Sequence, residues 1–200
     1  SFKALGAPVA LVREVLRRHP ALEPAEILTG RHAAALQGLT VISATDGNHG
    51  RGLAAAARDA GCACVIVLHA QVDPQREQAI AALPAVGGRV ILSEGTFQLN
   101  SNVGLSTYMT LQGQGRSTIL KFKAGVSGTP HFLYYEGGGN IGIMDLAIDG
   151  VGAATGDGIR LWDFQGEFRL YNVVMNSIDG RGVYIQPNGA FNLYMRDCEI

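Results

Sequence analysis

The sequence predicts a mosaic fold, with an N-terminal α/β fragment over residues 1–80 followed by a right-handed parallel β-helix, a solenoid of stacked coils, over residues 81–200. Composition gives the first indication, because residues 1–80 hold 17 of the 25 alanines and one of the 14 aromatic residues. Alanine favours helices, whereas aromatic residues favour strands. The second indication is a segment that recurs at intervals of 24 to 27 residues in the second part, as expected for stacked coils.

The first part alternates helical and strand patterns. Helical spacing or composition covers residues 10–19, 25–36, 53–60 and 74–83, whereas short β-branched runs cover residues 39–44 and 64–68. The segment 45–52 contains three glycines and is expected to be a loop. A strand, a glycine-rich turn, a helix and a second strand form a βαβ unit with parallel strands. In such a unit, anionic ligands bind at the turn after the first strand.

Two motifs in this part carry chemistry. The first is SFKALG at residues 1–6, and the second is ATDGNHGRG at residues 44–52. Together they resemble the pyridoxal-phosphate lyases of the tryptophan-synthase-β fold type, and most closely the diaminopropionate ammonia-lyases. The resemblance covers residues 1–80 and implies a carbon–nitrogen lyase that uses pyridoxal 5'-phosphate to eliminate ammonia from a small diamino acid such as 2,3-diaminopropionate.

The resemblance also implies roles for four residues. Lys3 would bind the cofactor as a Schiff base, and Phe2 would lie against the cofactor ring. Asn48 would hydrogen-bond the ring hydroxyl. Asp46 would remove the α-proton from one substrate enantiomer, while Lys3 would serve the other. Proton transfer next to an imine suits both groups, since the cofactor accepts the electrons.

This lyase pattern covers only part of the family's site. The family has a substantial segment before its lysine, whereas this chain has two residues there. The family also has a later glycine-rich phosphate loop and a partner for the pyridine nitrogen, and no segment after residue 80 matches these two features. The glycines at 137–139 belong to the repeated part instead. The chain begins within the first motif and ends at Ile200 within a repeated strand, so we interpret it as a lyase fragment joined to a truncated β-helix. We expect this 200-residue chain to be inactive.

The repeats of the second part align without gaps. Residues 140–148, 167–175 and 192–200 start 27 and then 25 residues apart, with apolar residues at alternate positions. The polar residue that follows these apolar positions is Asp145, Asn172 or Asp197, a type that tolerates left-handed backbone at a turn. A second strand recurs at residues 158–161 and 182–185.

The segments 87–97 and 110–120 resemble the opening coils of the pectate-lyase-like β-helix superfamily, which phage tailspikes and polysaccharide-active enzymes share. This resemblance implies the alternative function, a module that binds or cleaves polysaccharide. Cleavage would need paired carboxylates from neighbouring coils. The candidate acids, each also typical of a turn, are Asp145, Asp149, Asp157 and Asp179. The candidate sugar-stacking residues, each also typical of a core or ladder position, are Trp162, Tyr171, Tyr184 and Tyr194.

Composition excludes several classes. The 16 basic and 17 acidic residues give a net charge of -1, which argues against a nucleic-acid partner. No apolar run reaches about 18 residues, so we expect no membrane partner. Cys62 and Cys64 have no matching second pair, so we expect no metal site. No leader pattern is visible, and the lyase part points to the cytoplasm whereas the β-helix part points outside the cell.

Three functions therefore remain open: a lyase acting on a small amino acid, a polysaccharide-binding module, and a folded solenoid that carries an inactive lyase segment. We favour the third for this chain. In addition, an uncapped solenoid leaves an open sheet edge and apolar core at its end, which is a candidate surface for self-association.

Overall fold

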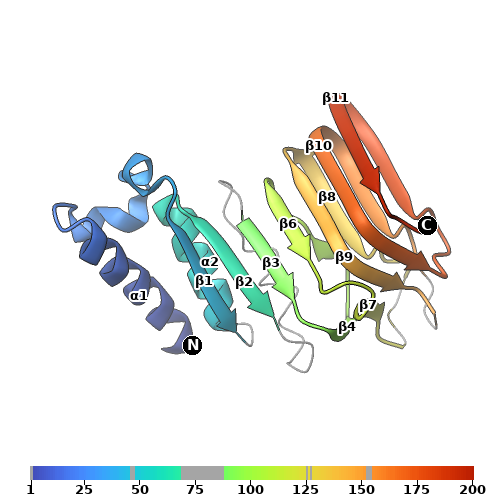
Figure 1. Cartoon of the computed structure of the whole chain (residues 1–200), viewed down its shortest axis with the longest axis horizontal. Helices are drawn as coiled ribbons and strands as arrows, with labels where there is room; N and C mark the ends of the chain where they lie inside the picture. The colour runs from blue at the N-terminus through green and yellow to red at the C-terminus, as the bar shows by residue number, and fades with distance from the viewer. Residues whose placement is uncertain (1, 46–47, 69–87, 125, 127, 152–154) are drawn as a thin grey trace.

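A computed structural model describes residues 2–45, 48–68, 88–124, 126, 128–151 and 155–200, apart from the side chains of residues 2–5, 45, 48 and 68. Its parallel strands form one 11-stranded sheet that begins in an α/β part and continues into a β-solenoid of about five turns (Figure 1). Among the described residues, no helix has both the length and the apolar character that crossing a bilayer requires.

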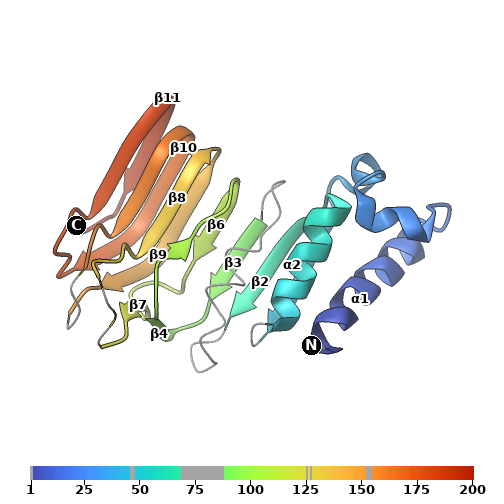
Figure 2. The same ribbon diagram turned by 180° about the vertical axis from the view of Figure 1, so that it is seen from behind.

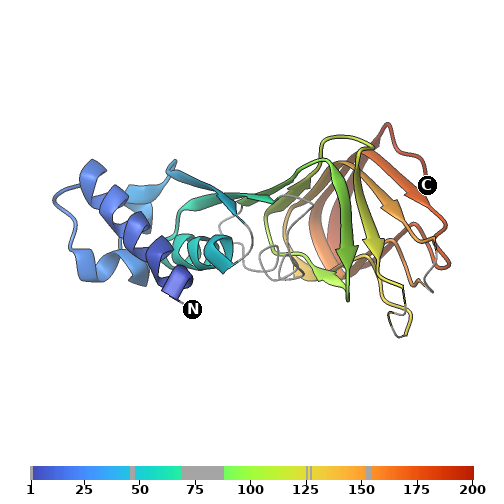
Figure 3. The ribbon, with the colours of Figure 1, turned by 90° about the horizontal axis from the view of Figure 1, so that it is seen from below.

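The α/β part consists of helix α1 (Phe2–Arg18), two 3-10 helices η1 (Pro24–Thr29) and η2 (Ala33–Leu36), strand β1 (Thr40–Thr45), helix α2 (Asn48–Ala60) and strand β2 (Ala63–Leu68). Strands β1 and β2 are parallel, which confirms the predicted βαβ unit. Both helices lie on the same face of these strands (Figure 3). Helix α1 buries Ala7, Leu11 and Val15, spaced four residues apart, and so presents one apolar stripe to the core.

Three local predictions in this part are wrong. The segment 25–36 is not one helix, because Gly30 adopts a left-handed φ of 77° and ends η1. The expected loop 45–52 is shorter, since α2 already begins at Asn48. Helix α1 starts at Phe2 rather than at residue 10 and continues through Pro8. The predicted helix at 74–83 lies outside the described residues.

The solenoid is built from strands that stack coil upon coil (Figures 1 and 2). Their bounds are β3 (Gly88–Leu92), β4 (Gly95–Leu99), β5 (Val103–Gly104), β6 (Met109–Gln112), β7 (Thr118–Phe122), β8 (Leu133–Gly138), β9 (Ile141–Asp149), β10 (Ile159–Asn176) and β11 (Val183–Arg196). Strand β10 turns a corner of the coil, because its first half pairs with β8 and its second half with β9. Each coil therefore contributes to more than one side of the solenoid.

Stacked apolar side chains fill the centre of the coils. Val90, Leu111, Ile143 and Leu170 occupy successive register positions in β3, β6, β9 and β10, and all four are fully buried. Interiors packed in this way hold each coil against its neighbours, as in other solenoids. In the last coil Met195 takes the next position, opposite Leu170, and is 44% exposed.

The predicted repeats are confirmed by the register. Phe168 pairs with Ile141 on one side and with Leu193 on the other, as the gapless alignment requires. Asp145, Asn172 and Asp197 all adopt positive φ, at 58°, 50° and 57°. The Asp145 carboxylate accepts hydrogen bonds from the side-chain amides of Gln112 and Asn172, both at 3.0 Å, so this corner forms a polar ladder.

Candidate functional site

The two motifs of the α/β part come to one end of the sheet. Helix α1 begins, β1 ends and α2 begins at this end (Figures 1 and 2). Phe2 and Lys3 lie in the first turn of α1, and Asn48 is the first residue of α2. Asp46 lies outside the described residues. The fold therefore brings the backbone of the lysine motif and the start of the helix in the glycine-rich motif to the same edge, where parallel α/β sheets bind ligands.

A cavity of about 300 Å³ lies between α1, β1 and the start of α2. Its lining includes Ala7 from α1, Ser43 from β1 and the half-buried His49 from α2. Ala7 follows Lys3 by four residues, which is about one helical turn. Each of the three elements that converge on the motif end thus also contributes to the cavity wall.

The charged groups on the cavity wall neutralise each other. Glu14 and Arg18 line the cavity, and the Arg18 Nε donates to the Glu14 carboxylate at 2.6 Å. Hydrogen bonds from Arg17 and Arg18 lower the pKa of Glu14 to about 2, so this carboxylate stays ionised at neutral pH. Because the pair is satisfied within α1, we expect an anionic ligand to find its partners at the α2 end.

The two cysteines of β2 and the turn before it do not belong to this site. Cys62 and Cys64 are buried and free. Burial raises the pKa of the Cys62 thiol above its ordinary value. Burial also raises the pKa of the Cys64 thiol, to about 12. Neither thiol is ionised at neutral pH, which makes both poor nucleophiles.

Comparison with known families identifies this part of the chain. A family model described as "Pyridoxal-phosphate dependent enzyme" matches residues 1–113, more than half of the 200 residues. The chain belongs to the family of pyridoxal-phosphate-dependent enzymes. The match continues past residue 80 and includes strands β3 to β6. No curated protein and no solved structure matches the chain.

The residue types at the motif end fit one side of pyridoxal phosphate. Lys3 supplies a primary amine, which can bind an aldehyde carbon covalently, and Asn48 carries a side-chain amide, a group that can hydrogen-bond a hydroxyl. Helix α2 begins at Asn48, and its first N–H groups suit an anion. From β3 onward, the described residues form solenoid coils. In the sheet, β2 lies between β1 and β3. The family's cofactor therefore has candidate partners on α1 and α2.

The four candidate acids of the solenoid are engaged in structural contacts. Asp145 holds the corner ladder, and Asp149 accepts hydrogen bonds from the Lys121 ammonium at 2.8 Å and from the Val151 N–H at 2.9 Å. Asp179 accepts a hydrogen bond from the backbone of Thr155 in the previous coil. These contacts match the turn and ladder roles rather than a pair of catalytic acids.

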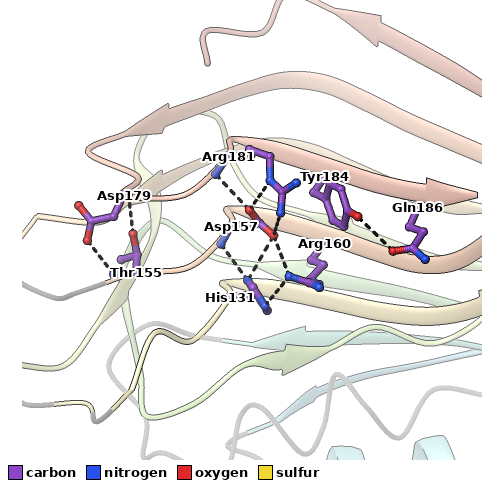
Figure 4. A network of polar contacts seen from close by, with 8 residues as sticks. All are labelled: His131, Thr155, Asp157, Arg160, Asp179, Arg181, Tyr184 and Gln186. Atoms are coloured by element: carbon purple, nitrogen blue, oxygen red, sulfur yellow. Dashed lines mark hydrogen bonds and ion pairs between the residues drawn. The ribbon is translucent and has the colours of Figure 1, made fainter.

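Asp157 is the centre of a polar network between coils (Figure 4). Its side chain is 4% exposed, and it accepts hydrogen bonds from the Arg181 Nε at 3.0 Å and the Arg160 Nη1 at 3.3 Å. The ring of His131 also hydrogen-bonds the Asp157 N–H at 2.8 Å. Burial acts to raise the pKa of Asp157, but the Arg181 hydrogen bonds and charge outweigh it, and the pKa falls below its ordinary value.

This network was not predicted from the sequence, where Asp157 was interpreted as a candidate acid or a turn residue. The signal was present in the coil period, because Arg181 follows Asp157 by 24 residues, the spacing of the second repeated strand. Residues separated by one period lie in neighbouring coils. A search for opposite charges at that spacing would have found the Asp157–Arg181 pair.

The four candidate stacking aromatics do not form one surface. Trp162 and Tyr184 lie together, with ring centroids 6.4 Å apart, on the side of the solenoid where β10 pairs with β8. Tyr171 belongs to the half of β10 that pairs with β9, and Tyr194 extends that side in β11. The corner within β10 separates the two pairs, so only Trp162 and Tyr184 remain as a joint stacking surface.

Proposed function

We propose that residues 1–80 carry the amine-bearing side of the cofactor site of a carbon–nitrogen lyase, which eliminates ammonia from a small diamino acid such as 2,3-diaminopropionate. Membership of the pyridoxal-phosphate-dependent family is the observation that carries the cofactor. The motifs SFKALG and ATDGNHGRG support the substrate class. The convergence of α1, β1 and α2 at one end of the sheet supports the same assignment.

In this proposal the Lys3 Nζ holds the cofactor covalently, Phe2 packs against its ring, and the Asn48 amide orients it through the ring hydroxyl. The Asp46 carboxylate takes the proton from the substrate Cα of one enantiomer, and the Lys3 amine takes it from the other. When bound, the cofactor supplies an electron sink for the carbon that loses its proton. Both bases are of types that proteins use for proton transfer.

We further propose that the 200-residue chain has no measurable turnover. The support is the course of the chain after β2, because the described residues from Gly88 onward build solenoid coils. A lyase needs groups that hold the phosphate and the pyridine nitrogen in addition to the lysine. Among the described residues before β3, the candidates for those contacts are α2 and the cavity wall.

Borohydride trapping tests the cofactor assignment without relying on activity. The chain has three lysines, Lys3, Lys121 and Lys123, so peptide mass spectrometry can resolve every lysine adduct. After incubation with pyridoxal phosphate and reduction, we expect about one adduct per chain, on Lys3. Lys123→Ala is the matched control, since Lys123 is exposed on the solenoid and its loss should leave the adduct unchanged. Labelling spread evenly over the three lysines would overturn the assignment.

Turnover assays with both enantiomers of 2,3-diaminopropionate test the proposal that the 200-residue chain is inactive. We expect no ammonia release above the level of Lys3→Ala. If the wild-type chain releases ammonia and Lys3→Ala does not, the inactivity proposal is wrong and the lyase assignment is strengthened. In that case Asp46→Ala should slow one enantiomer more than the other, and equal slowing would contradict the role of Asp46 as a base.

A further inference from the structure

Strand β1 is the first strand of the sheet, and among the described residues no strand lies on its outer side (Figure 1). It pairs with β2, and the Leu39 carbonyl just before it accepts a hydrogen bond from the Ala63 N–H of β2. Backbone groups alternate in direction along a strand, so those of Thr40 and Ile42 point to the outer edge. The outer edge of β1 therefore offers backbone donors and acceptors to a partner.

This edge has none of the features that usually prevent a strand from pairing. Natural edge strands are protected by charged residues, prolines or bulges. The sequence of β1, TVISAT, contains no charged residue and no proline, and its register with β2 runs through all six residues without a bulge. Ile42 is 68% exposed. The strand is therefore suited to receive another strand along its outer edge.

A groove lies between this edge and helix α1. Helix α1 packs on α2 and η1, whereas β1 packs on α2 and β2, so α2 forms the floor between them. The cavity of about 300 Å³ is the hollow of this groove, and residues 39–43 supply its β1 wall. Ala10 is an exposed residue of the α1 wall, and its small side chain leaves the groove open. We call this feature the β1 groove.

The chemistry of the β1 groove suits uncharged side chains. Leu11, Leu39 and Leu53 line it and are buried, so its inner surface is apolar. The charged pair in its wall is already satisfied, because the Arg18 Nε donates to the Glu14 carboxylate at 2.6 Å. A charged side chain entering the groove would lose water and gain no free counter-ion.

We propose that the β1 groove binds an extended, uncharged segment of a partner protein, which adds a strand to the outer edge of β1. The occupant is a polypeptide, because an extended backbone repeats its donors and acceptors at the spacing of the strand edge. Hydrogen bonds to the backbone of Thr40 and Ile42 supply affinity, and apolar side chains at alternate positions fill the cavity and supply specificity. The binding needs no cofactor, so it is independent of the lyase assignment.

A synthetic peptide tests the β1 groove directly. We would titrate the full chain, without cofactor, into a dye-labelled and amidated octapeptide of alternating valine and threonine, and follow fluorescence anisotropy. We expect saturable binding. The matched control peptide carries a methyl group on every backbone nitrogen, which keeps the side chains but removes the N–H donors, so it should not bind. No binding of the first peptide, or equal binding of both, would overturn the proposal.

Two variants locate the binding on the chain. Ile42→Pro removes an N–H that faces outward, a position at which edge strands tolerate proline. Ala10→Leu fills the groove from an exposed position on α1. We expect each variant to weaken peptide binding about tenfold, with the helical circular dichroism unchanged. Val9→Leu is the matched control, because Val9 is 51% exposed on α1 and is not among the residues that line the cavity. Its affinity should stay within about twofold of wild type.

The variants also separate strand addition from other occupants of the groove. A folded Ile42→Pro variant that binds the peptide like wild type would contradict pairing along β1. If Ile42→Pro unfolds, Ala10→Leu keeps the test valid, and a folded Ala10→Leu variant with wild-type affinity would equally contradict the proposal. If Ile42→Pro lowers the sedimentation coefficient of the chain without peptide, the edge pairs with a second copy, and the assignment to a partner protein is wrong.

Discussion

Ile66 of β2 and Val90 of β3 lie directly opposite each other in parallel register, and both side chains are fully buried. Strand β2 belongs to the α/β part, whereas β3 is the first strand of the solenoid. Leu111 of β6 occupies the next position and is also buried. The stack of apolar side chains therefore continues from one part into the other, and the two parts share a core.

This shared core predicts cooperative unfolding. Val90→Ala should lower the free energy of unfolding by about 2 kcal/mol, because it removes buried methyl groups and leaves a cavity. Helical circular dichroism reports on α1 and α2, while the emission of Trp162 reports on the solenoid. In urea, we expect both signals to shift to the same lower midpoint.

Ile42→Ala is the matched control, because Ile42 is 68% exposed on β1 and its truncation should change stability by less than about 0.5 kcal/mol. A Val90→Ala variant in which the emission midpoint moves and the helical midpoint stays would show that the two parts unfold separately.

Asp157 predicts a pH dependence of stability. Its pKa in the folded chain is lower than the ordinary 3.8, because Arg181 outweighs the effect of burial. The unfolded chain therefore takes up the proton first on acidification. The stabilisation is fully present above about pH 4 and is lost as the pH falls through the lowered pKa.

Asp157→Asn removes this titration. We expect the variant to be less stable than wild type by about 2 kcal/mol at pH 7, because the two guanidinium groups lose their charged partner. In urea unfolding, the difference should shrink steadily as the pH falls below about 4. Asp163→Asn, at an exposed carboxylate of β10, serves as the control. Parallel stability curves for wild type and Asp157→Asn would contradict the predicted linkage.

The left-handed corner at Asn172 predicts a third effect. Its φ is 50°, and its side-chain amide donates to Asp145 at 3.0 Å. Asn172→Gly loses the hydrogen bond and should cost about 1 kcal/mol, whereas Asn172→Val also places a β-branched residue at positive φ and should cost about 3 kcal/mol. Thermal unfolding compares the two variants. If glycine were the more damaging replacement, backbone strain would not be the deciding term.

The solenoid could be predicted because equivalent residues of its sequence repeats lie next to each other in neighbouring coils. Phe168, Leu193 and Asn172 could be placed from the alignment alone, since one coil period brings equivalent residues into register. The α/β part has no such period. Gly30 ends η1 through its own conformation, and the packing of α1 against α2 joins segments whose spacing carries no signal. Intrinsic helix propensities are a weak guide where tertiary packing decides the local structure.

The candidate site also has a part that the sequence predicted and a part that it did not. The motifs that contain Lys3 and Asn48 indicated the cofactor class, and the family match supports that class. Their place at one end of the sheet follows from the βαβ rule. The cavity beside Ala7 could not be predicted, because its volume depends on how closely α1 packs against α2 beside β1.

We propose that the last coil makes the chain self-associate through β11. Leu193 and Met195 are each 44% exposed, whereas Phe168 and Leu170, their register partners in β10, are fully buried. An exposed edge strand with apolar side chains favours pairing with another strand. Sedimentation velocity should show a concentration-dependent dimer, and Leu193→Lys combined with Met195→Lys should shift it to monomer. Arg196→Gln, on the same strand, is the control and should leave the dimer intact. A wild-type chain that stays monomeric up to millimolar concentration would contradict the proposal.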